Sequence, residues 1–211
     1  CSDAISGYSL ALAALLTGSS ESKLGIPHGK YRQVFTLAED MICTATQSNH
    51  LAQVKVQAGW MLISAVLRLG CISAQGCVQR LLLLWKSTFP RSVKEAESEK
   101  SRGDAFTWSC TLEARAGALA SMAVFAENCP SLLSDELISK MVFALECSLS
   151  MLSSVGVLIR SYGAKLRQLI AMTRIRLYNV LNALPPSCYE RLLSLLLREL
   201  VAEMTLADNT Q

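Results

Sequence analysis

Residues 104–129, DAFTWSCTLEARAGALASMAVFAENC, form a helix-patterned run in the middle of the chain and decide the fold that we predict. Apolar side chains recur in it at steps of three and four, which is typical of an amphipathic helix. Those on one face are Trp108, Leu112, Ala116, Leu119, Ala123 and Ala126. Asp104 stands where an N-cap is expected, and Pro130 follows the run. Near the centre lies the pair Ala116-Gly117.

The same glycine-centred pattern recurs around Gly7, Gly59 and Gly163. A glycine inside a helix costs about 1 kcal/mol relative to alanine, so a repeated one suggests that a neighbouring helix approaches closely there. Intervals of about 50 residues exceed the roughly 40 to 47 of HEAT-type repeats, and two inserts, 17–29 and 86–104, account for much of the excess. The pattern predicts an all-α fold, an α-solenoid of HEAT/armadillo-like antiparallel helix pairs. The alternative is an ordinary all-α domain in which the Ala-Gly pairs are coincidental.

Periodicity and helix breakers predict seven further helices, at about 3–16, 30–47, 51–69, 74–87, 134–153, 158–184 and 189–205. Gly70 is the expected end of the third helix, and Ser134 the expected cap of the sixth. Ser187 and Glu190 have the spacing of a capping box that opens the last helix. The predicted inner stripes are Leu166, Ile170, Thr173, Leu177, Val180, Leu181 and Leu184 on 158–184, and Leu192, Leu196, Leu200 and Met204 on 189–205.

Together the eight helices give about four pairs, 3–47, 51–89, 104–153 and 158–205, in a single helical-repeat segment, 1–211. Residues 86–104 alternate acidic and basic side chains, and we expect an exposed, charged insert with one or two helical turns. Because the chain starts at Cys1, we expect it to be a fragment of a longer solenoid.

The composition favours a soluble helical protein. Hydrophobic residues make up 51% of the chain, aromatic residues 6% and charged residues 18%, so the core must consist mainly of aliphatic side chains. Charged or polar residues interrupt every apolar run, so we expect no transmembrane segment. The eight scattered cysteines lack CxxC spacing, which favours a reducing, cytoplasmic location. A net charge of +3 gives no reason to expect binding of nucleic acid.

The sequence contains no motif of catalysis or metal binding. GxSxG, GxGxxG and HExxH are absent, and neither His28 nor His50 has a cysteine or carboxylate at metal-ligand spacing. Cys71 and Cys77, the closest pair of cysteines, fit no zinc or redox pattern. We therefore predict a protein that is not an enzyme, with no catalytic, cofactor-binding or metal-binding residues.

The charge distribution is uneven towards the C-terminus. Between Cys147 and Tyr189 the chain has no Asp or Glu, and its basic residues there are Arg160, Lys165, Arg167, Arg174 and Arg176. On one continuous helix, the spacing of seven from Arg160 to Arg174 gives a nearly straight stripe. Such a stripe could bind an acidic peptide or an anionic membrane surface. In the alternative interpretation, Asp135, Glu136, Glu199 and Glu203 on neighbouring helices neutralise these cations.

Several longer strings resemble the HEAT repeat-containing protein 5 family of very large helical-repeat proteins. They are SGYSLALAALL (6–16), LGIPH (24–28), QAGW (57–60), LLLLW (81–85), FPRSVKEAESEKSRGDAFTW (89–108), TLEARAGAL (111–119), RLYNVLNALPPSCYE (176–190) and LLRELVAEMTLADN (196–209). Together they extend over nearly the whole chain.

This resemblance implies a scaffold without enzymatic activity or cofactors that mediates protein–protein assembly in vesicle-mediated transport. The implied partners of the full-length protein are the clathrin-adaptor accessory proteins aftiphilin and gamma-synergin. The implied location is cytoplasmic and peripheral, at the trans-Golgi network and endosomes. The family offers no short motif whose residues carry over to this chain. Binding to anionic membrane surfaces or phosphoinositides through the basic stripe is the alternative function.

Overall fold

A computed structural model describes residues 1–19, 25–45, 51–101 and 104–208. These residues form eleven α-helices and no β-strand, so the predicted all-helical class is confirmed. The helices are α1 (Ser2–Ser19), α2 (His28–Thr44), α3 (Ala52–Arg68), α4 (Cys71–Gln75), α5 (Val78–Thr88), α6 (Val93–Ser101), α7 (Ala105–Asn128), α8 (Asp135–Leu152), α9 (Val155–Tyr162), α10 (Arg167–Ala183) and α11 (Leu193–Asp208).

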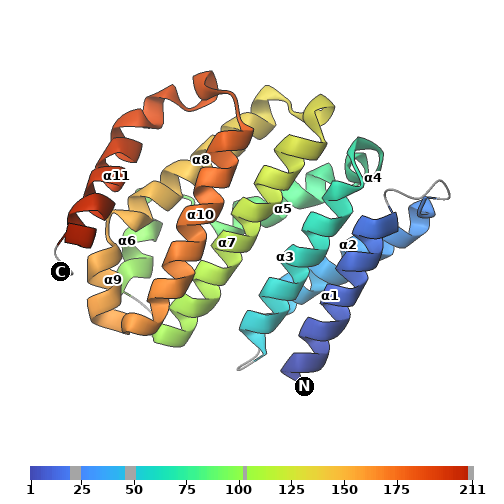
Figure 1. The fold of residues 1–211 in the computed structure, drawn as a ribbon, viewed down its shortest axis with the longest axis horizontal. Coiled ribbons are helices and arrows are strands. Elements are labelled where there is room, and N and C mark those ends of the chain that lie inside the picture. Colours follow the sequence, from blue (N-terminus) through green and yellow to red (C-terminus); the bar gives the residue numbers. More distant parts are fainter. Residues whose placement is uncertain (20–24, 46–50, 102–103, 209–211) are drawn as a thin grey trace.

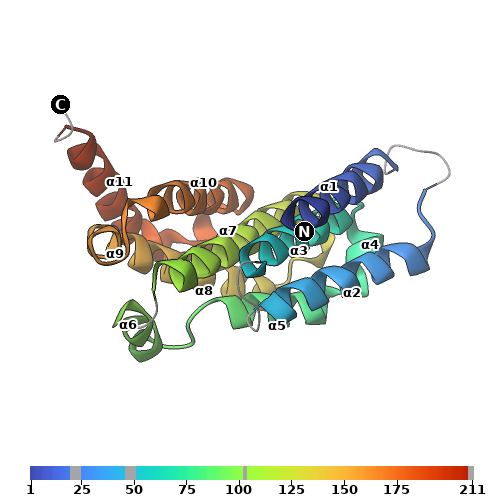
Figure 2. The same ribbon diagram turned by 90° about the horizontal axis from the view of Figure 1, so that it is seen from below.

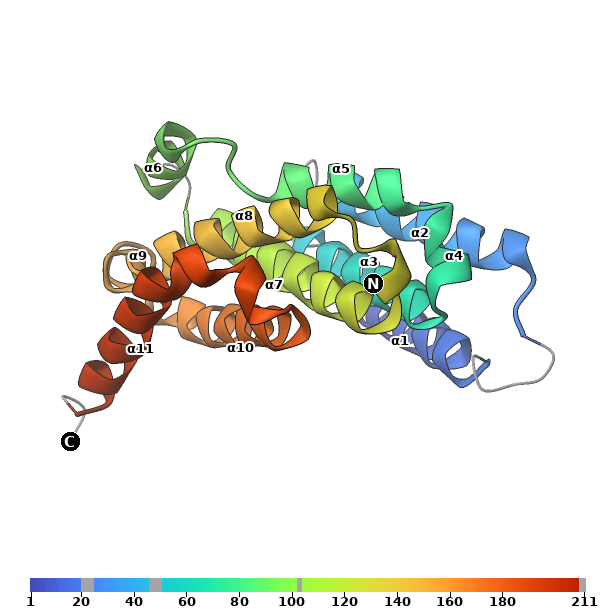
Figure 3. The same cartoon turned by 90° about the horizontal axis from the view of Figure 1, so that it is seen from above.

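The longer helices lie in two layers. One layer contains α1, α3, α7 and α10 side by side, and the other contains α2, α5 and α8 (Figures 1 and 2). In the order α1, α3, α7, α10, neighbours in that row pack on each other, and α3 also packs extensively on α2 of the second layer. The view from the opposite side shows α6 outside the second layer, beyond the end of α5 (Figure 3). The packing is compatible with an α-solenoid.

Close approach of α2, α3 and α7 depends on two of the predicted glycines. A Cβ added to Gly59 would lie 2.6 Å from Ile42 Cγ1 and 2.7 Å from the Ala38 carbonyl oxygen, both on α2. A Cβ added to Gly117 would lie 2.4 Å from the Trp60 ring on α3. Because neither position has room for a methyl group, the interpretation of these two glycines as packing positions is confirmed.

The other two glycines of the predicted repeat behave differently. An added Cβ on Gly7 would meet no atom within 4 Å, so no helix packs against it. Gly163 is not inside a helix: it follows α9 with a φ of +99°, a conformation that side-chain-bearing residues rarely adopt. The chain breaks there, and the single helix predicted at 158–184 is wrong. It is replaced by α9, a short 3₁₀ turn (Ala164–Leu166) and α10.

Helix ends that depend on local hydrogen bonds lie close to their predicted places. The Asp104 carboxylate accepts a 2.8 Å hydrogen bond from the Thr107 N–H and caps α7. The Ser134 hydroxyl accepts one from the Leu137 N–H and caps α8. Gly70, with a φ of +93°, follows the end of α3. These three predictions are confirmed.

Around the last helix the predictions fail in part. The capping box of Ser187 and Glu190 does not form: two 3₁₀ turns (Pro186–Cys188 and Glu190–Leu192) occupy that segment, and α11 begins only at Leu193. Leu192 is buried but Leu200 is 40% exposed, so the predicted inner stripe is only partly correct. The stripe predicted on 158–184, by contrast, is buried throughout.

Two further segments differ in detail. The helix predicted at 74–87 is divided into α4 and α5, and the charged insert contains the nine-residue α6. Some features of the prediction lie outside the described residues. They are residues 20–24 of the first insert, the end of the predicted helix 30–47, His50, and the side chains of Glu203 and Met204. In the described part of the chain no single helix meets the length and apolarity needed to cross a bilayer; α8 and α9 together meet them, with a 60° bend between the two.

Candidate functional site

The break at Gly163 separates the basic residues that the sequence suggested as one stripe. Arg160 lies on α9, Lys165 on the 3₁₀ turn, and Arg167, Arg174 and Arg176 on α10. The prediction of a straight line of cations along one helix is therefore wrong. The side chains of Arg160, Lys165 and Arg167 are exposed and lie close together in the chain: Lys165 is in the turn, and the two arginines are on either side of it.

Farther along α10 the cations have acidic neighbours. Arg174 is bound to Glu199 of α11 through two of its nitrogens, at 2.7 and 2.8 Å, and only 3% of the Glu199 side chain is exposed. Arg176 lies near Glu113 of α7. Burial raises the pKa of the Glu113 carboxyl, while a hydrogen bond from Gln53 and the charge of Arg176 lower it. For Arg174, the alternative interpretation, in which a neighbouring acid neutralises the cation, is the correct one.

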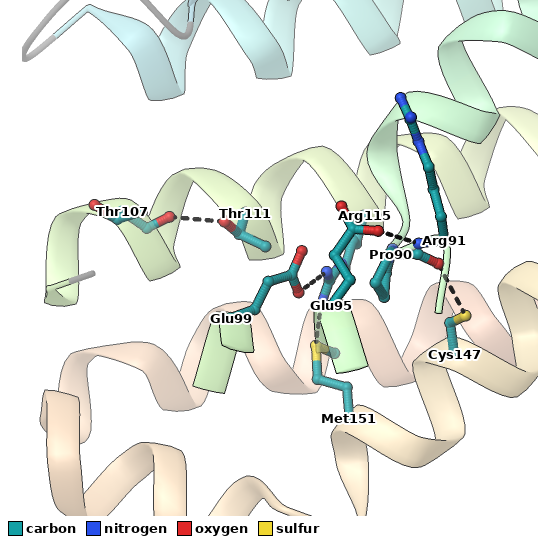
Figure 4. Close-up of polar contacts among 9 residues, drawn as sticks. All are labelled: Pro90, Arg91, Glu95, Glu99, Thr107, Thr111, Arg115, Cys147 and Met151. Atoms are coloured by element: carbon teal, nitrogen blue, oxygen red, sulfur yellow. Dashed lines mark hydrogen bonds and ion pairs between the residues drawn. The ribbon is translucent and has the colours of Figure 1, made fainter. Parts of the chain in front are cut away.

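The charged insert is anchored by a buried arginine. Arg115 of α7 is 3% exposed, and its guanidinium binds Glu99 of α6 at 2.5 Å and the Met151 sulfur of α8 at 3.1 Å. It also lies 6.0 Å from the centre of the Phe89 ring. Figure 4 shows Glu99 of α6 next to Arg115 and Met151, and Pro90 in the segment before α6 next to Cys147. Cys147 is within hydrogen-bond range of the Pro90 carbonyl, 3.9 Å away.

A groove of about 490 Å³ lies between α5 and α8, and we call it the α5–α8 groove. Its apolar lining includes Leu82, Leu83, Trp85, Phe89, Met122 and Phe143. Trp85 is held in place by a 2.8 Å hydrogen bond from its Nε1 to the Ser121 hydroxyl, and by edge contact with Phe125. Leu83 and Phe143 are 65% and 41% exposed, so part of the apolar surface faces solvent.

Cationic side chains surround this groove. Lys86, Arg91, Lys140 and Arg191 line it, against one carboxylate, Glu136. Arg191 forms a 3.6 Å ion pair with Glu146, and both side chains are largely exposed. No ion pair between two described residues involves Lys86, Arg91 or Lys140. The groove therefore combines an apolar floor with a positive rim.

A second groove, of about 440 Å³, crosses the other layer between α1 and α10. Trp60 and Gly117 contribute to its floor, and Gln57, Arg68, Glu113 and Arg176 are among its polar residues. One carboxylate, Glu113, shares this groove with two cations, Arg68 and Arg176. The Trp60 Nε1 is buried and has no hydrogen-bond partner among the described residues.

Cysteines and side chains of the metal-ligand types are present among the described residues. No group of three or more His, Cys, Asp or Glu side chains among them is placed to hold a metal ion. All eight cysteines are free, and burial raises the pKa of the Cys129 thiol to about 12 and that of the Cys147 thiol to about 11. Since nucleophilic attack needs the thiolate, these two thiols are unreactive near neutral pH.

Sequence reasoning did not find the α5–α8 groove. Its residues come from positions 79–91, 122, 136–144 and 191, and no single segment shows the combination. The available signal was indirect: LLLLW places a leucine on every side of α5, so one of them must face away from the core. That leucine is Leu83.

No protein-family model matches the chain, and no solved structure matches it.

Proposed function

We propose that this chain is a non-catalytic segment of a helical-repeat scaffold, built from HEAT/armadillo-like helix pairs, that mediates protein–protein assembly in clathrin-adaptor-linked vesicle traffic between the trans-Golgi network and endosomes. The family resemblance suggests aftiphilin and gamma-synergin as partners. The observation that supports a binding role is the α5–α8 groove, where exposed apolar side chains lie within a rim of cations. Grooves between helices are a common place for proteins to bind helical or extended peptides.

Direct binding tests this function. Purified 1–211 protein, immobilised through a tag, should retain purified aftiphilin or gamma-synergin, and a helical protein of similar size and charge should not. Retention should survive moderate salt because the contact has an apolar part. Absence of retention of either protein, with the folded state verified by circular dichroism, would contradict the proposed partners.

A second candidate function is binding to an anionic membrane surface or to phosphoinositides. The observation in its favour is the exposed cluster of Arg160, Lys165 and Arg167 around the turn between α9 and α10. Clustered cations near a surface contribute about 1 kcal/mol each to binding of anionic lipid. Of the five basic residues suggested by the sequence, Arg174 contributes least, because Glu199 is bound to it.

Flotation with phosphatidylserine-containing vesicles tests this second function. Retention that is lost in Arg160→Glu/Arg167→Glu and kept in Lys86→Glu/Lys140→Glu would support it. The two variants have the same change in net charge, so a general charge effect would reduce both equally. No flotation of the wild-type protein at low salt would rule this function out.

A further inference from the structure

We infer that the α5–α8 groove binds a short acidic peptide segment that carries bulky apolar side chains. This inference rests on the proposed function as a scaffold and specifies the chemistry of one partner. It concerns a site that is separate from the basic residues of α9 and α10.

The floor of the groove fits bulky apolar side chains. Met122 is fully buried and Trp85 is 2% exposed, so the floor is fixed by the core beneath it. Leu83 on α5 and Phe143 on α8 stand exposed along the same groove. Peptide sites of this kind draw most of their affinity from a few apolar or aromatic anchors in a desolvated centre. The groove has a volume of about 490 Å³.

The rim determines the charge of the partner. Four cationic side chains and one carboxylate line the groove, and one of the cations, Arg191, is paired with Glu146 outside the lining. The other three, Lys86, Arg91 and Lys140, outnumber Glu136, which leaves a local excess of positive charge around an apolar centre. Lys86 projects from α5 and Lys140 from α8, so both helices contribute cations. A basic peptide would meet like charges, which is costly, whereas an acidic one is steered into the groove.

The recessed shape favours a peptide over a lipid surface. A membrane would reach the exposed Leu83 and Phe143 but not Trp85, Phe89 and Met122, which are at most 5% exposed. A peptide side chain can reach that floor while its neighbouring carboxylates meet the lysines. Such a peptide would contact both the apolar floor and the positive rim of the groove.

Fluorescence anisotropy with defined probes tests the inference. The probe is a fluorescein-labelled peptide in which Asp and Glu flank a Leu-x-x-Phe core; one control replaces Leu and Phe by Ala, and another replaces the acids by Lys. We expect the first probe alone to bind. In Lys86→Glu/Lys140→Glu its affinity should fall by about tenfold or more, with a smaller loss in Lys86→Gln/Lys140→Gln. Lys30→Glu/Arg167→Glu, which reverses two exposed cations elsewhere, should bind like the wild type.

The inference is overturned by no binding of the acidic probe, by equal losses in the groove variant and its control, or by equal binding of the alanine probe. Groove-dependent binding of phosphatidylserine vesicles without peptide binding would also overturn it, in favour of a membrane. If the probe does not bind but the protein partners are retained in the pull-down, the groove inference falls and the scaffold function stands. If the probe binds but no protein partner is retained, the groove stands and the proposed partners fall.

Discussion

Gly117 and Gly7 lie within two helices of the same layer, yet an added methyl group would meet very different surroundings. In Gly117→Ala the new Cβ would lie 2.4 Å from the Trp60 ring, so α3 and α7 must move apart. Overpacking of this kind costs about 1–3 kcal/mol, which outweighs the gain of about 1 kcal/mol in helix propensity. We expect urea denaturation to show a lower unfolding midpoint with an unchanged slope.

Two further glycine variants serve as controls for this prediction. Gly7→Ala should be neutral or stabilise the protein by up to about 1 kcal/mol, because nothing lies within 4 Å of the new Cβ. Gly163→Ala also has space, but at a φ of +99° it should destabilise by about 1–3 kcal/mol through backbone strain. Equal effects of Gly117→Ala and Gly7→Ala would show that Gly117 is not a packing position.

Because of the buried thiol of Cys129, the free energy of unfolding should vary with pH in the alkaline range. Its pKa is about 12 in the folded protein, against 9.0 for the exposed group, so above pH 9 the unfolded chain releases this proton and the folded chain retains it. Stability must then fall as pH rises from 9 towards 12. Between pH 8 and 10 this group should account for a loss on the order of 1 kcal/mol.

Cys129→Ala removes that contribution. We expect the variant to be less stable at pH 8, because a buried side chain is shortened, but to lose less stability between pH 8 and 10 than the wild type. Lysines and tyrosines titrate in both proteins, so their effect cancels in the difference. Parallel urea-derived stabilities of the two proteins over this range would contradict the assignment.

At the scale of elements, an ion pair between two described residues attaches α6 to α7. Glu99 is the carboxylate that binds the buried Arg115, and its side chain is 35% exposed. In Glu99→Gln the arginine loses its charged partner, with an expected destabilisation of roughly 1–2 kcal/mol after allowance for exposure. Hydrogen exchange should accelerate in α6. Glu97→Gln, an exposed position on the same helix, should leave exchange in α6 unchanged, and equal acceleration in both variants would refute this attachment.

The sequence predicted helix boundaries well where they depend on neighbouring residues. Asp104 and Ser134 cap helices through hydrogen bonds to backbone three residues on, and such bonds need no distant partner. Gly163 misled the prediction because a glycine is compatible both with tight helix packing and with a positive φ, and the sequence does not distinguish the two. The Ser187 and Glu190 spacing failed because 3₁₀ turns occupy the segment that follows Pro185.

The α5–α8 groove belongs to the scale of the whole molecule, which explains why the sequence could not reveal it. Lys86 and Lys140 acquire a common role only when α5 and α8 lie on either side of Met122. Periodicity indicates which face of each helix is apolar, but not which helices become neighbours. By contrast, the pairing of Arg174 with Glu199 was among the alternatives that charge alone had suggested, because the nearby helix is also near in sequence.

From the packing of α1, α3, α7 and α10 in a row we also predict how resistance to local unfolding is distributed among these helices. Neighbouring helices in this row pack extensively on each other, so a cavity should weaken them according to its place in the row. Leu119→Ala removes a fully buried side chain from α7, at a cost of about 2–5 kcal/mol. Native-state hydrogen exchange should then accelerate in α3, α7 and α10 together.

Leu16→Ala, at the edge of the row in α1, should accelerate exchange in α1 and leave exchange in α10 unchanged. If Leu16→Ala instead weakens protection in α10 as much as Leu119→Ala does, the protein unfolds as one cooperative unit, and stability is not transmitted from neighbour to neighbour along the row.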